Sequence, residues 1–276
     1  MRHIINKNKY IIVFSIIFVI CFLLFQNYKN YKLDKKDTIT IACGNDASGM
    51  LFDYIINTKK NSNIEFSNID YIQFLDCCGS QAEFAFISGR VDMAVLCPDA
   101  AFQLVSIDTN YYIVDSIVKG SNILVYYNES YDDDNIKPKN IGYMNKRLLQ
   151  EILLKEKYSN SNYYPMLSTA LPYALEKKTV DAVLIDIILA LKIKEARFKK
   201  IDTEEVDYYL VASKKLKDTL MLNNFIKAYN EAVNDIEDEI ILSNMLVNYL
   251  DISNSEGEIK TWKTMGVKFL KIKAES

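Results

Sequence analysis

The chain has 276 residues, which is enough for one large or two modest domains, and half of these residues are hydrophobic. A quarter are charged and the formal net charge is −3, a balance that excludes a disordered chain and a nucleic-acid-binding surface. Because the one histidine, His3, precedes the first hydrophobic run, mechanisms that need an imidazole base or a histidine-bound metal are nearly excluded.

An apolar run at residues 10–25 indicates a membrane helix or a signal-peptide core. No small-residue cleavage site follows it, and the residues before Cys21 lack the small residue that a bacterial lipoprotein signal carries there. Lysines on both sides favour the N-terminus inside the cell only weakly. We therefore expect residues 1–37 to be a retained anchor and tether, with the globular part outside the cytoplasm at the cell membrane.

The first predicted strand, residues 38–43, ends in a turn with the sequence Gly-Asn-Asp-Ala-Ser-Gly before an apolar helix at 50–56. Asp46, Ala47, Ser48 and Gly49 leave backbone N–H groups and a hydroxyl at the start of that helix. Such a turn attracts anionic or carbonyl groups of a ligand. Aspartate and serine are also favoured helix caps, so a plain capped turn is the alternative.

A helix–strand unit at residues 77–99 occurs a second time, at 174–186. In both copies an alanine, Ala85 or Ala174, lies six residues before the valine of a Val-Asp pair. The ends of the first copy carry Cys78, Gly79 and Ser80, and Cys97, Pro98 and Asp99, whereas the second copy ends at Asp186. Two copies in separate halves of the chain indicate two similar α/β lobes.

The remaining predicted elements continue this alternation. Gly120 separates strands at 111–118 and 122–127 and marks the crossover between lobes. A strand at 140–144 is followed by a helix, which begins with Asn145, Lys146 and Arg147. Ser168 and Thr169 cap the helix after a strand at 162–166, a strand at 206–212 returns to the first lobe, and a last helix covers 259–269. We therefore expect an α/β fold with parallel sheets, divided into 38–118, 119–205 and 206–276.

This order of elements resembles the extracytoplasmic solute-binding proteins of bacterial ABC transporters, which have a two-lobed periplasmic-binding-protein fold. The resemblance is strongest to the branch that binds nitrate, sulfonates and thiamine pyrimidines, and it covers about residues 38–270. Its motifs are Gly-Arg-Val-Asp-Met-Ala at 89–94 and Thr-Val-Asp-Ala-Val at 179–183. The resemblance implies a small-molecule ligand in a cleft between the lobes, an ABC permease and ATPase as partners, no cofactor and no catalytic step.

Open α/β sheets bind ligands beyond the carboxyl ends of their strands. This rule places residues 45–49, 78–80 and 97–99 of the first lobe opposite 145–147, 168–169 and 186 of the second. Lys146 and Arg147 are candidates for holding a carboxylate, sulfonate or phosphate, or are a solvated helix terminus. Asp99 and Asp186, at matching ends of the repeat, are candidates for an amine or hydroxyl, or are helix caps.

Four cysteines, Cys43, Cys77, Cys78 and Cys97, follow predicted strands and are expected to converge on the cleft floor. Three interpretations stay open: small buried apolar residues, a disulfide such as Cys43 or Cys78 with Cys97, or a thiolate site for a soft metal. Two other functions also stay open. One is a thiol-dependent enzyme like the thiamine-pyrimidine synthases, whose histidines have no counterpart here, and the other is a membrane-tethered sensor.

Overall fold

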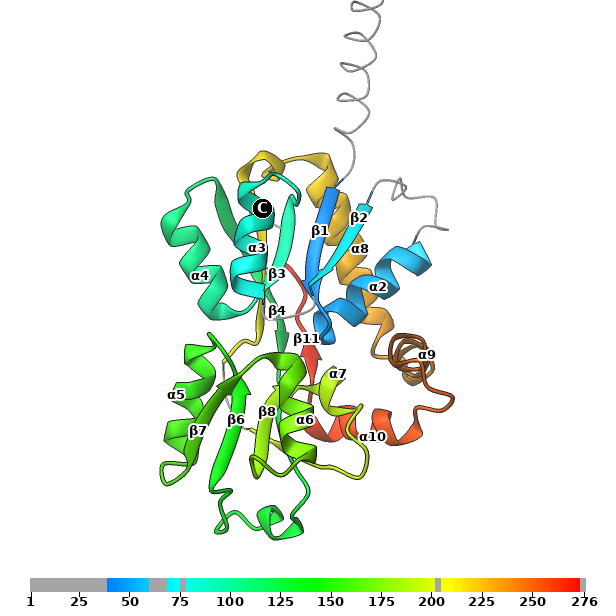
Figure 1. Cartoon of the computed structure of the whole chain (residues 1–276). Coiled ribbons are helices and arrows are strands. Elements are labelled where there is room, and N and C mark those ends of the chain that lie inside the picture. The colour runs from blue at the N-terminus through cyan, green and yellow to red at the C-terminus, as the bar shows by residue number, and fades with distance from the viewer. Residues whose placement is uncertain (1–38, 60–68, 75–77, 202–204, 274–276) are drawn as a thin grey trace, which may run out of the picture. The chain divides into compact units, whose positions relative to one another are not determined.

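The computed structural model describes residues 39–59, 69–74, 78–201 and 205–273 (Figure 1). The described residues, from 39 onward, form one compact unit. The predicted anchor and tether lie outside the described residues. Within the part of the chain that the structure describes, no helix is long and apolar enough to cross a membrane.

Two sheets organise the fold. The six-stranded sheet has the order β11-β4-β10-β3-β1-β2, and the five-stranded sheet has the order β7-β6-β8-β5-β9. The strands of the first are β1 (Ile39–Gly44), β2 (Ile69–Phe74), β3 (Met93–Leu96), β4 (Tyr111–Lys119), β10 (Tyr208–Ser213) and β11 (Lys268–Phe269). Those of the second are β5 (Asn122–Tyr126), β6 (Asn140–Met144), β7 (Asn162–Met166), β8 (Ala182–Asp186) and β9 (Arg197–Lys200).

Both sheets are mixed, so the prediction of parallel sheets is wrong in part. β1 is parallel to β2 and β3, and β6 is parallel to β7 and β8. However, β10 runs antiparallel to β3 and β4, and β5 runs antiparallel to β8 and β9. Parallel neighbours need a crossover connection, whereas β4 passes directly into β5 of the other sheet and β10 returns from the other sheet.

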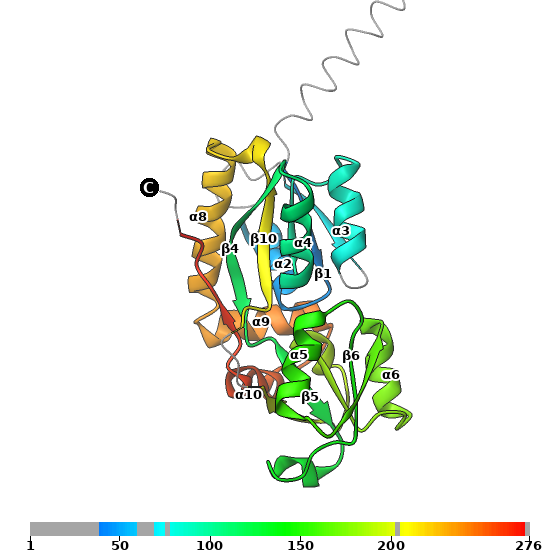
Figure 2. The same ribbon diagram turned by 90° about the vertical axis from the view of Figure 1, so that its left-hand side faces the viewer.

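Helices cover both faces of the six-stranded sheet (Figures 1 and 2). α2 (Ala47–Lys59) and α8 (Leu220–Asp235) cover one face, and α3 (Cys78–Ile87) and α4 (Pro98–Ile107) cover the other. The alternation along β1 explains this division, because Ile39 and Ile41 pack in the cluster with α2 and α8, while Ala42 packs with α3 and α4.

The five-stranded sheet is covered by α5 (Leu148–Lys157) on one face and by α6 (Leu171–Glu176) and α7 (Ile187–Ala190) on the other. Short 3₁₀ helices lie at Glu129–Asp132, Ser168–Ala170 and Lys214–Leu216. The C-terminal helices α9 (Glu239–Leu250) and α10 (Glu256–Met265) pack against α2 and β9, respectively. One apolar cluster therefore runs from the first sheet to the second, through residues such as Phe225, Ile185 and Trp262.

The predicted last helix at 259–269 is too long at its end. Gly266 has a left-handed backbone with φ 72° and closes α10 after Met265, and Lys268 and Phe269 then pair with β4 as β11. β9 is a strand that sequence reasoning missed. Its four residues, Arg-Phe-Lys-Lys, carry no apolar alternation, and its place at the edge of the sheet explains why charged residues are tolerated there.

The duplicated Val-Asp pair is part of the scaffold. Asp92 accepts a hydrogen bond from the backbone N–H of Thr40 at 3.0 Å, and Asp181 accepts one from Asn140 at 2.7 Å. Each carboxylate thus ties the start of β3 or β8 to the neighbouring parallel strand. Two residues after the helix that precedes each pair lies a residue with a left-handed backbone, Gly89 or Lys178. The repeat therefore records one folding unit used twice.

Candidate functional site

The strand ends of the two sheets, together with the two connections between the sheets, form the candidate site, which we call the junction. β1 is parallel to β3, and β6 to β8, so the carboxyl ends of each pair share an edge. β10 begins at the same edge as the end of β3, and Asn122 at the start of β5 lies opposite Asp186 at the end of β8. Residues that are remote in sequence therefore meet at the junction.

Carboxylates at the junction occupy the starts of helices that belong to the opposite sheet. Asp186 Oδ1 accepts from the N–H of Ile188 in its own helix and from the N–H of Ala47 in α2, both at 3.0 Å. Asp99 Oδ2 accepts from the N–H of Leu149 in α5 at 3.4 Å. These reciprocal hydrogen bonds hold the two sheets together at the junction.

Arg147 is buried at the start of α5, with an exposed fraction of 3%. Its guanidinium carbon lies 5.1 Å from the centre of the Tyr208 ring, a cation–π distance. Burial raises the pKa of Asp46 and that of Asp207, and the positive charge of Arg147 lowers both in part. The prediction of a solvated cation is therefore wrong for Arg147, and its charge is directed at the protein's own carboxylates.

Asp207 connects the two passages of the chain between the sheets. Its carboxylate accepts from the N–H of Ser121 at 2.6 Å and from the side-chain amide of Asn122. The Asn122 carbonyl oxygen accepts in turn from Gln150 Nε2 at 3.0 Å, and Gln150 Oε1 accepts from the N–H of Met144 at 3.2 Å. This chain of hydrogen bonds joins the start of β10 to β5, α5 and β6.

The turn at 44–49 is capped from within. Asp46 Oδ1 accepts from the Ser48 hydroxyl at 2.5 Å and from the Gly49 N–H at 3.0 Å, which is the geometry of a helix N-cap. A Cβ atom on Gly49 would lie 2.2 Å from the carbonyl oxygen of Gly44, so only glycine lets the helix start this close to β1. Asp46 therefore satisfies the Ser48 hydroxyl and the Gly49 N–H within the turn, while the Ala47 N–H donates to Asp186.

Asp186 is a junction carboxyl with a strongly raised pKa. Burial, and then the negative charges of Asp46 and Asp207, raise its pKa from 3.8 to about 8. The Tyr208 hydroxyl donates to Asp186 Oδ2 at 3.3 Å. At neutral pH Asp186 therefore holds a proton in the folded protein, since ionising it would place another negative charge beside two buried carboxyls.

The structure brings together part of the predicted set. Asp46, Ala47, Asp99, Arg147 and Asp186 meet at the junction through the contacts given above. The other predicted residues of the described part lie as follows: Asn145, Lys146 and Thr169 are exposed, Ser48, Gly49, Pro98 and Ser168 are buried, and Cys78, Gly79 and Ser80 begin α3. A role for any of them in binding stays a prediction.

The prediction that Asp99 and Asp186 occupy equivalent positions of the two repeat copies is wrong by two residues, because Cys97 is the residue equivalent to Asp186. Cys97 and Asp186 each lie six residues after the valine of the repeat, and each is the N-cap of the following helix with similar backbone angles. Asp186 caps its helix through its side chain, whereas Cys97 makes no side-chain cap bond. Asp99 instead lies in the first turn of α4, from where it reaches α5.

The predicted convergence of the cysteines is wrong for Cys43 and Cys97. Both are buried, but Cys43 packs in the apolar cluster with α2 and α8, and Cys97 in the cluster with α3 and α4, on the other face of the sheet. Cys77 and the side chain of Cys78 lie outside the described residues. In the described part of the chain, no three His, Cys, Asp or Glu residues are grouped as metal ligands would be.

Sequence reasoning missed five residues of the junction: Ser121, Asn122, Gln150, Asp207 and Tyr208. Four of them flank the points where the chain passes between the sheets. The signal available in the sequence was Gly120, which has a left-handed φ of 75° and stands directly before Ser121. The polar residues next to this crossover glycine, and those at the start of the returning strand, could therefore have been predicted as site residues.

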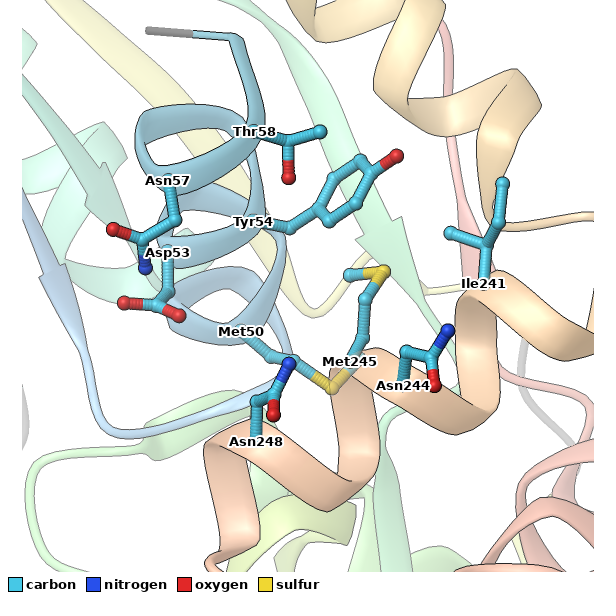
Figure 3. Close-up of a pocket in the computed structure, with 9 residues that line it drawn as sticks. All are labelled: Met50, Asp53, Tyr54, Asn57, Thr58, Ile241, Asn244, Met245 and Asn248. Carbon is cyan, nitrogen blue, oxygen red and sulfur yellow. The ribbon is translucent and has the colours of Figure 1, made fainter. Parts of the chain in front are cut away.

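Two pockets bear on the site. A small one of about 40 Å³ lies at the junction, lined by residues that include Asp99, Asn122, Arg147 and Asp207. A larger groove of about 580 Å³ runs between α2 and α9, where Met245 lies between the helices and Tyr54 points toward Ile241 (Figure 3). The lining of the groove comes from these two helices alone, whereas the junction joins both sheets and both connections.

No family model and no curated protein matches the sequence. Solved structures do match the fold. The ligand-binding component of an ABC-type import system from Staphylococcus aureus, with zinc bound, is 14% identical with a TM-score of 0.64, over 86% of this chain and 87% of that one. The periplasmic aliphatic sulphonate binding protein from Escherichia coli is 12% identical with a TM-score of 0.64, over 86% and 82%.

A nutrient binding protein from Burkholderia cenocepacia, bound to methionine, is 16% identical with a TM-score of 0.57, over 73% of this chain and 96% of that one. The chain has a periplasmic-binding-protein-like fold. This confirms the fold that the sequence resemblance implied. The ligands named for these structures differ from one another, so the fold does not identify the ligand of this protein. The ligand has to be inferred from the side chains of the junction.

Proposed function

We propose that this protein captures a small solute between two lobes and delivers it to an ABC importer, without a catalytic step. The observation that carries the proposal is the meeting of both sheets at their strand ends, through the Asp186–Ala47 and Asp99–Leu149 contacts. Ligands of open α/β sheets bind at this place. The three solved structures of similar fold named above are binding proteins, which supports the same role.

The lobes of this proposal are residues 38–118 with 206–276, and residues 119–205. Its hinges are the two connections, at Gly120–Asn122 and at Val206–Asp207. Since α10 packs against β9 and one apolar cluster spans both sheets, the lobes separate on the opposite side, where α4 contacts α5. A solute that binds both lobes favours the closed arrangement by its differential affinity.

The location and partners follow from the same proposal. Residues 1–37 anchor the protein in the cell membrane, and the globular part lies outside the cytoplasm, where a permease and its ATPase accept the solute. The test is protease treatment of intact cells followed by membrane fractionation. We expect a membrane-bound protein whose globular part is digested from outside. Digestion only after cell lysis contradicts this location.

The test of solute capture is a thermal-shift screen of the purified full chain against amino acids, amines, sulfonates and nucleobases. A bound solute raises the melting temperature, because it binds the folded state alone. Small-angle scattering should then show a smaller radius of gyration with solute, as the lobes close.

Matched variants locate the bound solute. Asn122→Ala at the junction should weaken binding at least tenfold, whereas Asn248→Ala in the groove between α2 and α9 should leave the affinity within twofold. The opposite result moves the site to the groove. Conversion of the solute into a product contradicts a role without catalysis.

A further inference from the structure

We infer that the solute carries a positive charge, an ammonium or a guanidinium group, which Asp207 and Asp99 hold at the junction. The inference rests on the proposed function and names the class of solute for the same site. It reverses the expectation that Lys146 and Arg147 receive an anion. Four observations lead to it: the charge of the cluster, the occupied anion sites, the acceptor oxygen of the Ser121 hydroxyl, and the small pocket.

The buried cluster has more carboxylates than cations. It consists of the buried Asp186, Asp207 and Arg147 together with the half-buried Asp46, and the charges of these groups act on one another. The exposed fractions of Asp186, Asp207 and Arg147 are 1%, 7% and 3%. Three carboxylates against one guanidinium leave an excess of negative charge when all are ionised. Buried charge without a partner is costly, and a bound cation removes that cost.

The groups at the junction that suit an anion are already occupied. The N–H of Ala47 at the start of α2 donates to Asp186, and the N–H of Leu149 at the start of α5 donates to Asp99. The guanidinium of Arg147 acts on Asp46 and Asp207. An anionic group would have to displace one of these carboxylates and would then meet the repulsion of the others.

The Ser121 hydroxyl is a buried polar group beside the cluster, and it acts on Asp186. Ser121 has no exposed surface, and its hydroxyl lies close enough to lower the pKa of Asp186. A hydroxyl that donates to a carboxyl keeps the lone pairs of its oxygen as acceptors. Its oxygen and the neighbouring carboxylates are the acceptors that an ammonium group needs.

The small pocket gives the charged group its place. Gly120 and Asn122, on either side of Ser121, line it together with Asp99 and Asp207. Its volume of about 40 Å³ exceeds the roughly 10–15 Å³ that a cavity needs to hold one water-sized group. The pocket therefore accommodates one ammonium group, and the rest of the solute extends toward the α4–α5 side.

Proton linkage gives the inference a distinctive signature. The groups that face Asp186 are the carboxyls of Asp46 and Asp207, the hydroxyls of Tyr208 and Ser121, and the N–H groups of Ala47 and Ile188. With a pKa of about 8, Asp186 is protonated at pH 7 in the empty protein. A cation nearby lowers this pKa, so binding releases a proton and strengthens as the pH rises from 6 to 8.

The test uses a charge series of probes on the full chain: putrescine and arginine as cations, methionine as a zwitterion, and ethanesulfonate as an anion. Titration calorimetry at pH 7 in two buffers of different ionisation enthalpy counts the protons exchanged. We expect the cations alone to bind, with proton release and at least a threefold gain in affinity from pH 6 to pH 8. Asp207→Asn should weaken binding at least tenfold, and the exposed control Asp133→Asn should not change it.

Three outcomes overturn the inference. If ethanesulfonate binds, or if binding takes up protons, solute capture stands and the positive charge is wrong. If a cation binds with equal affinity to Asp207→Asn and to the wild type, the placement at the junction is wrong. If no solute of any charge binds, here or in the wider screen, the proposed function fails as well. The pH series on the wild type decides the question even if Asp207→Asn does not fold.

Discussion

Two sets of aspartates in this protein accept hydrogen bonds from backbone N–H groups, but the two sets have different structural roles. Asp92 and Asp181, directly before β3 and β8, each accept from a backbone N–H of the neighbouring strand in their own sheet. Asp186 and Asp207 also accept from backbone N–H groups, but these belong to segments 139 and 86 residues away, at the junction. The first set builds each sheet, and the second set joins the two sheets.

The difference between the sets lies in their surroundings. Asp92 and Asp181 are half-buried, one in each sheet and each beside a single parallel strand pair. Asp186 and Asp207 are buried near each other and near Asp46, and burial is the first cause of their raised pKa values. The hydrogen bond to a backbone N–H is the same in both sets. Whether such a carboxylate supports the sheet or belongs to the candidate site therefore depends on the groups around it.

The largest effect should come from removing the cation of the junction. Arg147→Met removes the positive charge that lowers the pKa of the Asp46 and Asp207 carboxyls, and removing one partner of a buried charge interaction costs about 3–5 kcal/mol. Urea denaturation should show this loss in the free energy of unfolding. The matched control is Lys146→Met at the exposed neighbour, which should change stability by about 0.5 kcal/mol at most. Equal losses in both variants would contradict the role given to the Arg147 charge.

The next effect is a pH dependence that Asp186 causes. Its pKa is 3.8 in the unfolded chain and about 8 in the folded protein, so between these values the folded state holds a proton that the unfolded state has lost. Stability should therefore fall as the pH rises from 4 to 8, by up to about 1.4 kcal/mol per pH unit from this group.

Asp186→Asn removes that titration and should flatten the fall, measured as the free energy of unfolding at pH 5, 6, 7 and 8. Asp133→Asn, in the exposed loop after β5, is the control and should keep the wild-type slope. The same slope in Asp186→Asn and the wild type would show that another group titrates.

A smaller loss of stability, without a loss of solute affinity, should distinguish Asp92 and Asp181 from the aspartates of the junction. Asp92→Ala and Asp181→Ala each remove one hydrogen bond to a strand N–H and should cost about 1–2 kcal/mol. Solute affinity, measured by calorimetry on the folded fraction, should stay within twofold of the wild type. A tenfold loss of affinity in either variant would show that the scaffold carboxylates also shape the junction.

The smallest effect concerns Tyr208. Its hydroxyl donates to Asp186 over 3.3 Å, a long hydrogen bond, so Tyr208→Phe should lower the melting temperature by only a few degrees, for about 1 kcal/mol. Tyr209→Phe, the next residue on the other face of β10, packs on the Phe102 ring and should change the melting temperature less. A larger loss in Tyr209→Phe would mean that the Asp186 contact contributes nothing measurable.

The elements were predictable because their causes are local. Strands β6 and β7 have the predicted bounds, 140–144 and 162–166, and the Gly/Asp/Ser turn before α2 is a cap, as its residue types favour. The prediction failed where the cause is distant. β9 is a strand because β5 lies beside it, and β10 runs antiparallel because the chain returns from the other sheet.

The sequence by itself determined the alternation of helices and strands, the duplicated Val-Asp unit and the resemblance to a fold that solved structures confirm. Only the tertiary structure decided that Arg147 points inward while Lys146 is exposed, that Cys43 and Cys97 lie on opposite faces of a sheet, and that Asp207 joins Asp46 and Asp186. The reason is physical. Caps and periodicity depend on residues within one or two turns, whereas the charge of a buried site is the sum over side chains that only folding brings together.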